Sequence, residues 1–110
     1  MIVDDNADMR RLIKTITHGL ADSFIECSDG LQALQQYAAQ KPDWVLMDIE
    51  MPTLDGIAAT KEIKLAFPSA RILIVTEYDD AYWREESERA GACGYVLKDS
   101  LSQLRSLLVS

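Results

Sequence analysis

The chain has 110 residues, a formal net charge of −7 and a hydrophobic content of 48%. This length suits a single domain, residues 1–110, with its own core. The acidic balance argues against direct nucleic-acid contact by this segment, and no apolar stretch approaches the roughly 20 residues of a membrane span. The opening residues lack the pattern of a secretory signal, so we expect a cytoplasmic protein. We interpret Cys27 and Cys93 as buried free thiols.

Short apolar runs predict the strands of a sheet. Continuous runs rich in Val, Ile and Leu are typical of strands that are buried on both faces, as in parallel sheets. Four runs fit this description: Ile2–Val3, Trp44–Met47, Ile72–Val75 and Tyr95–Leu97. A fifth strand, Phe24–Cys27, is interrupted by Glu26, which an edge strand tolerates.

Helical spacing of apolar residues fills the segments between these runs. The first helix has its apolar face from Met9 to Leu20, and Asn6 or Asp8 caps it. The second and third helices end before Pro42 and Pro68. The apolar positions of these two helices and of the last helix are Leu31, Leu34 and Ala38; Ala59, Ile63, Ala66 and Phe67; and Leu101, Leu104 and Leu108.

The fourth helix, at about residues 80–90, differs from the others. Only Trp83 and Ala90 are clear core contacts in its sequence. A helix with so thin an apolar stripe is weakly held by packing, and we expect this element to be the least firmly fixed.

Strands that alternate with helices predict an α/β fold built from right-handed βαβ units. Five units in this length suit a flavodoxin-like, doubly wound, five-stranded parallel sheet in the order 2-1-3-4-5, with helices on both faces. In that order the first and third strands are neighbours.

Each of the four apolar runs ends on a chemically useful side chain. The first run ends on Asp4 and Asp5, and the others end on Asp48, Thr76 and Lys98. Ligands of open parallel sheets bind beyond the carboxyl ends of the strands. We therefore expect these five residues to meet in one cleft.

Three carboxylates in one cleft repel one another. At about 5 Å and an effective dielectric constant near 20, each pair costs on the order of 3 kcal/mol. Mg²⁺ would relieve this repulsion, because it binds one or two carboxylates together with a phosphate oxygen. Asp48 is the central carboxylate, and a carboxylate can attack a phosphoryl group to form an acyl phosphate. The only histidine, His18, lies off the apolar face of the first helix, and we expect it at the surface.

These residues resemble those of the response-regulator receiver domains of two-component systems, in register over nearly the whole chain. The resemblance rests on Asp4-Asp5, Met47–Pro52 with Asp55-Gly56, Thr76, and Gly91–Lys98. Residues 91–99, Gly-Ala-Cys-Gly-Tyr-Val-Leu-Lys-Asp, look most like receivers joined to LuxR-type helix-turn-helix domains.

The resemblance implies that Asp48 accepts phosphate from a partner sensor histidine kinase. It implies that Asp4, Asp5, Asp48 and the backbone carbonyl of Glu50 hold Mg²⁺, for which Mn²⁺ can substitute. Thr76 and Lys98 would contact the phosphoryl group. The domain would be no enzyme beyond its own phosphorylation and dephosphorylation.

The resemblance also places Thr76 and Tyr95 at switch positions, with an output surface on the fourth helix, fifth strand and fifth helix. It is compatible with a homodimer on phosphorylation. The chain is either a stand-alone receiver or a fragment of a transcription regulator with a DNA-binding output domain in the full-length protein. Glu50 and Tyr78 match positions that tune phosphorylation and hydrolysis rates. Two residues depart from the common pattern: Glu77 stands in place of a small residue, and Asp99 in place of a proline.

Other interpretations stay open. A degenerate receiver would act as a phosphorylation-independent protein-interaction module. A flavodoxin-like enzyme that binds a nucleotide or flavin is disfavoured, because no Gly-rich loop follows the first strand. Taken singly, Asp4-Asp5 fits a helix cap, Thr76 a strand-end hydroxyl, Lys98 a surface lysine and Tyr95 a core aromatic. Their combination favours the receiver.

Overall fold

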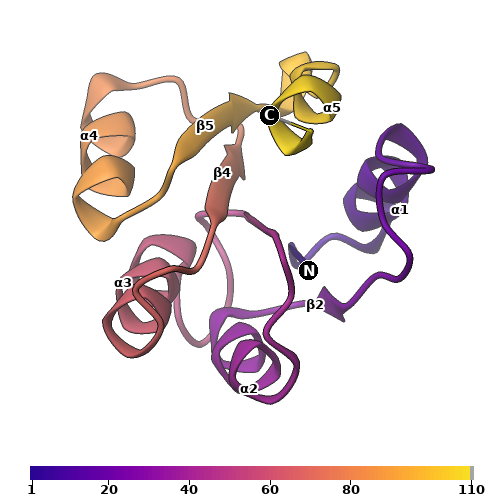
Figure 1. Cartoon of the computed structure of the whole chain (residues 1–110). Coiled ribbons are helices and arrows are strands. Elements are labelled where there is room, and N and C mark those ends of the chain that lie inside the picture. The colour runs from indigo at the N-terminus through magenta and orange to yellow at the C-terminus, as the bar shows by residue number, and fades with distance from the viewer. Residues whose placement is uncertain (110) are drawn as a thin grey trace.

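Strands and helices alternate along the whole chain. The computed structural model describes residues 1–109. Its strands are β1 (Ile2–Val3), β2 (Glu26–Cys27), β3 (Val45–Met47), β4 (Ile72–Thr76) and β5 (Gly94–Leu97). Its helices are α1 (Ala7–Ile16), α2 (Gly30–Gln40), α3 (Gly56–Ala66), α4 (Ala81–Ala90) and α5 (Gln103–Leu108), with a 3₁₀ turn, η1 (Lys98–Ser100), after β5. Figure 1 shows the helices arranged around the central sheet.

The sheet has the predicted topology. Its strands are all parallel and lie in the order β2-β1-β3-β4-β5. Val3 of β1 pairs with Met47 of β3, and Met47 pairs with Ile74 of β4. The carboxyl ends of β1 and β3 are therefore level, so the residues that follow them lie side by side, and β4 continues beyond this level to Thr76.

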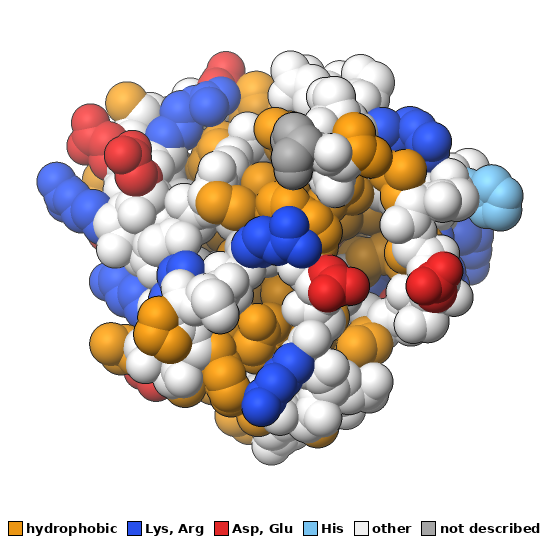
Figure 2. Space-filling model, in the orientation of Figure 1, with side chains coloured by type: hydrophobic (Ala, Val, Ile, Leu, Met, Phe, Trp, Pro, Cys, Tyr) orange, Lys and Arg blue, Asp and Glu red, His pale blue; other side chains and the backbone are white. Residues whose placement is uncertain are grey.

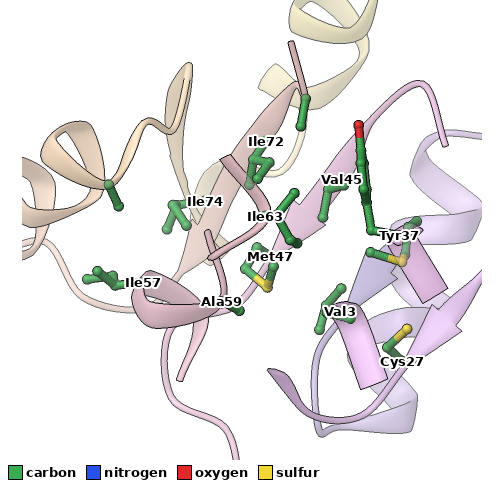
Figure 3. Packing of buried hydrophobic residues seen from close by; sticks show 14 of the residues in the cluster. Val3, Cys27, Tyr37, Val45, Met47, Ile57, Ala59, Ile63, Ile72 and Ile74 are labelled. Carbon is green, nitrogen blue, oxygen red and sulfur yellow. The ribbon is translucent and has the colours of Figure 1, made fainter. Parts of the chain in front are cut away.

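Both faces of the sheet are buried, which explains the continuous apolar runs of its strands. One face packs against α2, α3 and α4, and Figure 3 shows its central side chains, which include Val3, Met47 and Ile74. The other face packs against α1 and α5 through Leu46, Val75 and their neighbours. Alternate residues of each strand thus serve opposite cores, and the fold prediction is confirmed.

The first helix ends earlier than its apolar spacing predicts. Asn6 caps it by accepting hydrogen bonds from the N–H groups of Asp8 and Met9, but the last helical residue is Ile16. Gly19 then adopts a φ of 86°, a left-handed conformation that ends the helical path before Leu20.

The second strand is also shorter than expected. Only Glu26 and Cys27 of the segment Phe24–Cys27 pair with β1, and Phe24 is exposed.

The two cysteines have different environments. Cys27 is buried, as expected, but Cys93 is exposed, so the interpretation of Cys93 as a buried thiol is wrong. Cys93 lies in the connection from α4 to β5, at the edge of the sheet, where its Sγ donates a hydrogen bond to the Ile72 carbonyl over 3.4 Å.

The fourth helix is sparsely packed, as its sequence indicates. Ala90 is buried and Trp83 is half-buried against the core, and Ser87 is also buried. The Ser87 hydroxyl donates to the Trp83 carbonyl within the helix, so it adds no apolar contact.

The surface shows no concentration of positive charge on the face in Figure 2. Lys and Arg side chains are scattered there among apolar and acidic ones. His18 is exposed, as expected. Within residues 1–109, every helix is too short or too polar to cross a bilayer.

Candidate functional site

The residues that follow the strands meet in a cleft of about 210 Å³ at the carboxyl edge of the sheet. The structure brings all five strand-end residues of the sequence analysis together there. The cleft is lined by Asp4, Asp5, Asn6, Met9, Asp48, Glu50, Thr76, Glu77, Tyr78 and Lys98.

Three carboxylates form the acidic part of the cleft. Asp4 and Asp48 are buried, with 1% and 7% of their surface exposed, whereas Asp5 is exposed. One carboxylate oxygen from each of the three lies within 4.8 Å of the others. Oxygen donors at this spacing suit a hard divalent cation such as Mg²⁺.

Lys98 supplies positive charge to the cluster. Its Nζ lies 2.9 Å from Asp4 Oδ2 and 3.4 Å from Asp48 Oδ2. Burial alone would lower the pKa of Lys98, but the contacts with the two carboxylates outweigh burial and raise it. Lys98 is therefore a firmly protonated ammonium that faces more than one carboxylate.

Asp48 resists ionisation. Burial and the neighbouring charge of Asp4 raise the pKa of its carboxyl from 3.8 to about 6. Lys98 and the Ile49 N–H, which donates to Asp48 Oδ1 over 2.9 Å, oppose this rise without cancelling it. Near neutral pH the group is mostly ionised, and its ionised form lowers the stability of the folded protein.

Asp4 is fixed through almost all its polar atoms. Its N–H donates to the Cys27 carbonyl over 3.0 Å. Its Oδ1 accepts the Asn6 N–H over 2.9 Å, and its carbonyl oxygen accepts Arg10 Nη1 over 2.6 Å. Only Oδ2 lacks a hydrogen bond within the described residues, although the Lys98 ammonium is near it. This buried oxygen therefore has the Lys98 ammonium as its charged neighbour and no neutral hydrogen-bond donor among the described residues.

Gly56 lets the third helix approach the cleft. A Cβ at this position would overlap the backbone carbonyl oxygen of Asp48. Its N–H donates to the Ile49 carbonyl over 2.7 Å, and Asp55 caps α3 at the preceding position. The Asp55-Gly56 pair therefore fixes the loop that follows Asp48.

Thr76 and Tyr95 are linked through the loop between β4 and α4. Thr76, at the end of β4, is 1% exposed, and its Oγ1 accepts the Tyr78 N–H over 3.2 Å. Tyr95 is half-buried on β5, and its hydroxyl donates to the Tyr78 carbonyl over 2.5 Å. Both side chains thus hold the backbone of the same residue.

Tyr78 also connects the mouth of the cleft to α4. Its hydroxyl donates to the carboxylate of Glu50, and this hydrogen bond raises the pKa of Tyr78 to about 12. Its ring stacks on that of Trp83, with 5.3 Å between the ring centroids. Changes at the cleft therefore have a direct contact path to the sparsely packed helix.

Comparison with known proteins assigns the family. The sequence-family model for the response regulator receiver domain matches residues 1–108. The chain belongs to this family. It is 37% identical over 98 residues to the chemotaxis protein CheY of Halobacterium salinarum, covering 89% of this chain and 82% of that protein. Over 104 residues it is 36% identical to the transcriptional regulatory protein YxjL of Bacillus subtilis, covering 93% of this chain and 48% of YxjL.

Solved structures agree with this assignment. The receiver resembles a LuxR-family DNA-binding response regulator from Staphylococcus aureus with a TM-score of 0.88 and 25% identity, covering 98% of this chain and 92% of that one. It resembles the response regulator domain of Thermotoga maritima CheB with a TM-score of 0.82 and 33% identity, covering 98% and 87%. The receiver thus spans about half the length of a curated transcriptional regulator that it matches and most of a chemotaxis protein.

Several residues around the receiver's cleft were not found by the sequence analysis. Asn6 was considered only as a cap, yet its N–H also holds Asp4. Arg10 and Glu26 were not assigned to the site, although Arg10 bonds both Glu26 and the Asp4 carbonyl. Their charges were the available signal, but only the pairing of β1 with β2 shows that they meet.

Removing the charge of Asp48 should stabilise the metal-free receiver. Because folding raises the pKa of Asp48 from 3.8 to about 6, the folded state binds more protons between these values, so ionisation costs stability above pH 6. Asp48→Asn should therefore raise the free energy of unfolding by about 1–2 kcal/mol at neutral pH. Urea denaturation in a chelator measures this gain, which should shrink as the pH falls below 6.

The exposed Asp99 provides the matched control, since Asp99→Asn removes a charge near the same edge of the sheet. Its stability should change little at any pH. A lower free energy of unfolding for Asp48→Asn than for wild type at neutral pH would contradict the prediction that the ionised carboxylate destabilises the fold.

Proposed function

We propose that Asp48 is the phosphoacceptor of this receiver and that a sensor histidine kinase is the donor. The observation that carries the proposal is the buried Asp48 carboxylate, whose charge is disfavoured by burial and by Asp4 and which shares the Lys98 ammonium with Asp4. In the transfer, a carboxylate oxygen of Asp48 forms the new bond to phosphorus. The bond from phosphorus to the donor histidine breaks, and its electron pair leaves with the imidazole nitrogen.

The acidic cluster fits Mg²⁺, with Mn²⁺ as a substitute. Asp4 Oδ2 is buried without a hydrogen bond within the described residues, and it shares the Lys98 ammonium with Asp48; this and the close spacing of the three carboxylates support the assignment. Asp4, Asp5, Asp48 and the backbone carbonyl of Glu50 would hold the ion. When bound, it supplies positive charge that offsets both the carboxylates and the oxygens of the incoming phosphoryl group.

Lys98 and Thr76 are the protein's own donors to that group. The Lys98 ammonium already lies at Asp48 Oδ2, where charge arrives as the phosphoryl group is transferred. The Thr76 hydroxyl lines the same cleft and can turn from the Tyr78 N–H to donate to a phosphoryl oxygen. Both residues favour the phosphorylated form without taking part in bond breaking.

A small phosphodonor provides the direct test. Incubated with acetyl phosphate and Mg²⁺, the receiver should gain the mass of one phosphoryl group in intact-protein mass spectrometry. The gain should be lost in Asp48→Asn and in the presence of a chelator, and it should be retained in the control Asp99→Asn.

Absence of an adduct with acetyl phosphate and with a phosphorylated histidine donor would contradict the proposal. That result would favour a phosphorylation-independent interaction module. An adduct that persists in Asp48→Asn would place the phosphoacceptor at another residue.

The wider role follows from the family. Residues 1–110 form a single receiver domain, placed in the cytoplasm with its kinase. A DNA-binding output domain in the full-length protein accords with the likeness to YxjL and to the LuxR-family regulator. Phosphorylation favours a homodimer, and the domain catalyses only its own phosphorylation and dephosphorylation.

The output surface consists of α4, β5 and α5. A phosphoryl group adds roughly −1.5 to −2 charges at Asp48. If Thr76 turns to it, the Tyr78 N–H loses its acceptor, and the loop is weakened at Tyr78, whose carbonyl is held separately by the Tyr95 hydroxyl. Because α4 has few buried apolar contacts, a change in this loop shifts α4 at low cost.

Amide hydrogen exchange tests this coupling. Addition of beryllofluoride and Mg²⁺, a phosphoryl mimic, should change exchange in residues 80–98 and leave the exchange of α2 nearly unchanged. The change in residues 80–98 should be reduced in Thr76→Ala, which lacks the hydroxyl. Identical exchange with and without the mimic would rule out α4 and β5 as the output.

A further inference from the structure

We propose that Arg10 and Glu26 are positioning residues that fix the Asp4-Asp5 pair for the divalent cation. The inference rests on the proposed function of the cleft and concerns residues outside it. Arg10 Nη1 donates to the Asp4 carbonyl over 2.6 Å, while Arg10 Nε donates to Glu26 Oε1 over 3.0 Å. One guanidinium thus ties the edge strand β2 to the backbone between the two acidic residues.

The bonded carbonyl is the one that matters for Asp5. It belongs to the planar peptide unit that joins Asp4 to Asp5, so holding its oxygen sets the orientation of the whole unit. The side chain of Asp5 makes no hydrogen bond or ion pair within the described residues. Its placement in the acidic cluster therefore depends on its backbone, which Arg10 holds at the Asp4 carbonyl and Asp4 Oδ1 holds at the Asn6 N–H.

The alternation of side chains along β2 and the helical spacing along α1 bring Glu26 and Arg10 together. Cys27 packs in the core against α2, so Glu26, its neighbour on β2, faces the opposite side of the sheet, where α1 lies. Arg10 and Lys14 are four residues apart on α1 and share one face. Arg10 and Lys14 both bind the Glu26 carboxylate, at 3.0 and 3.1 Å. The carboxylate, held by Lys14, thus fixes the Arg10 guanidinium on the side away from Asp4.

The ion pair is better enclosed than the other arginine pair of this helix. The Arg10 side chain is 18% exposed, whereas that of the next residue, Arg11, is 75% exposed and, within the described residues, bonds only the Asp8 side chain of its own helix. A guanidinium presents two N–H groups in a rigid fork, and a lysine ammonium cannot reach both acceptors with the same geometry. Arg10→Lys therefore keeps the charge but loses the bridge.

A purely electrostatic role and a positioning role of Arg10 predict opposite effects of mutation on cation binding. If Arg10 acted only through its positive charge near the cluster, removing that charge would strengthen cation binding and Arg10→Lys would change nothing. If Arg10 positions Asp5, both Arg10→Gln and Arg10→Lys weaken cation binding. Mutation of residues that hold a metal ligand in place typically lowers the metal affinity by about tenfold or more.

Titration calorimetry with Mg²⁺ alone distinguishes these cases. We expect Arg10→Lys and Arg10→Gln to weaken Mg²⁺ binding about tenfold and Glu26→Gln to weaken it less, while Arg11→Lys matches wild type. The double variant Arg10→Lys/Glu26→Gln should lose little more than Arg10→Lys, because the two residues act as one unit. Thermal unfolding in a chelator controls for stability, and all five variants should unfold within a few degrees of wild type.

A second readout reports position directly. In amide NMR spectra of the metal-free protein, the Asp5 resonance should shift in Arg10→Lys and stay in place in Arg11→Lys. Unchanged Mg²⁺ affinity in Arg10→Lys, or tighter binding in Arg10→Gln, would overturn the inference while leaving the phosphoacceptor proposal intact. A wild-type protein that neither binds Mg²⁺ nor takes a phosphoryl group would overturn both.

Discussion

The contact of one lysine with two buried aspartates is the interaction around which the receiver's cleft is organised. Lys98 reaches both Asp4 and Asp48, and Asp5 adds a third carboxylate nearby. One ammonium cannot balance three negative charges, so Asp48 holds its charge with a raised pKa. The fold thus maintains a site that is short of positive charge. This shortage is the basis of the proposed divalent cation, which would in turn offset the charge of an incoming phosphoryl group.

The sheet provides the rigidity that such a site requires. Level pairing of β1, β3 and β4 sets the two buried aspartates side by side, and apolar packing on both faces keeps this register. The responsive part is built differently. The loop after Thr76 is held by individual hydrogen bonds, and α4 beyond it contributes few buried residues. The cleft and the proposed output helix α4 therefore differ in their degree of packing within one small domain.

Local patterns predict the sheet and the residues at its edge, because continuous apolar runs and the residue types that end them are visible in sequence. Helix ends are harder: α1 ends near Gly19 through a backbone conformation that the apolar spacing does not report. The exposure of Cys93 depends on the edge position of a connection. The Arg10–Glu26 bridge joins residues 16 apart whose faces are known only once β1 and β2 pair. The exposure of Cys93 and the Arg10–Glu26 bridge could not be predicted, because they depend on which segments pack together in the folded chain.

The most direct test of this account is a titration of the Asp48 carboxyl carbon by NMR, in chelator and in saturating Mg²⁺. The account predicts a pKa of about 6 in chelator and a value below the ordinary 3.8 with Mg²⁺, since the cation supplies the missing positive charge. An ordinary pKa in chelator, or a raised pKa that Mg²⁺ leaves unchanged, would contradict it.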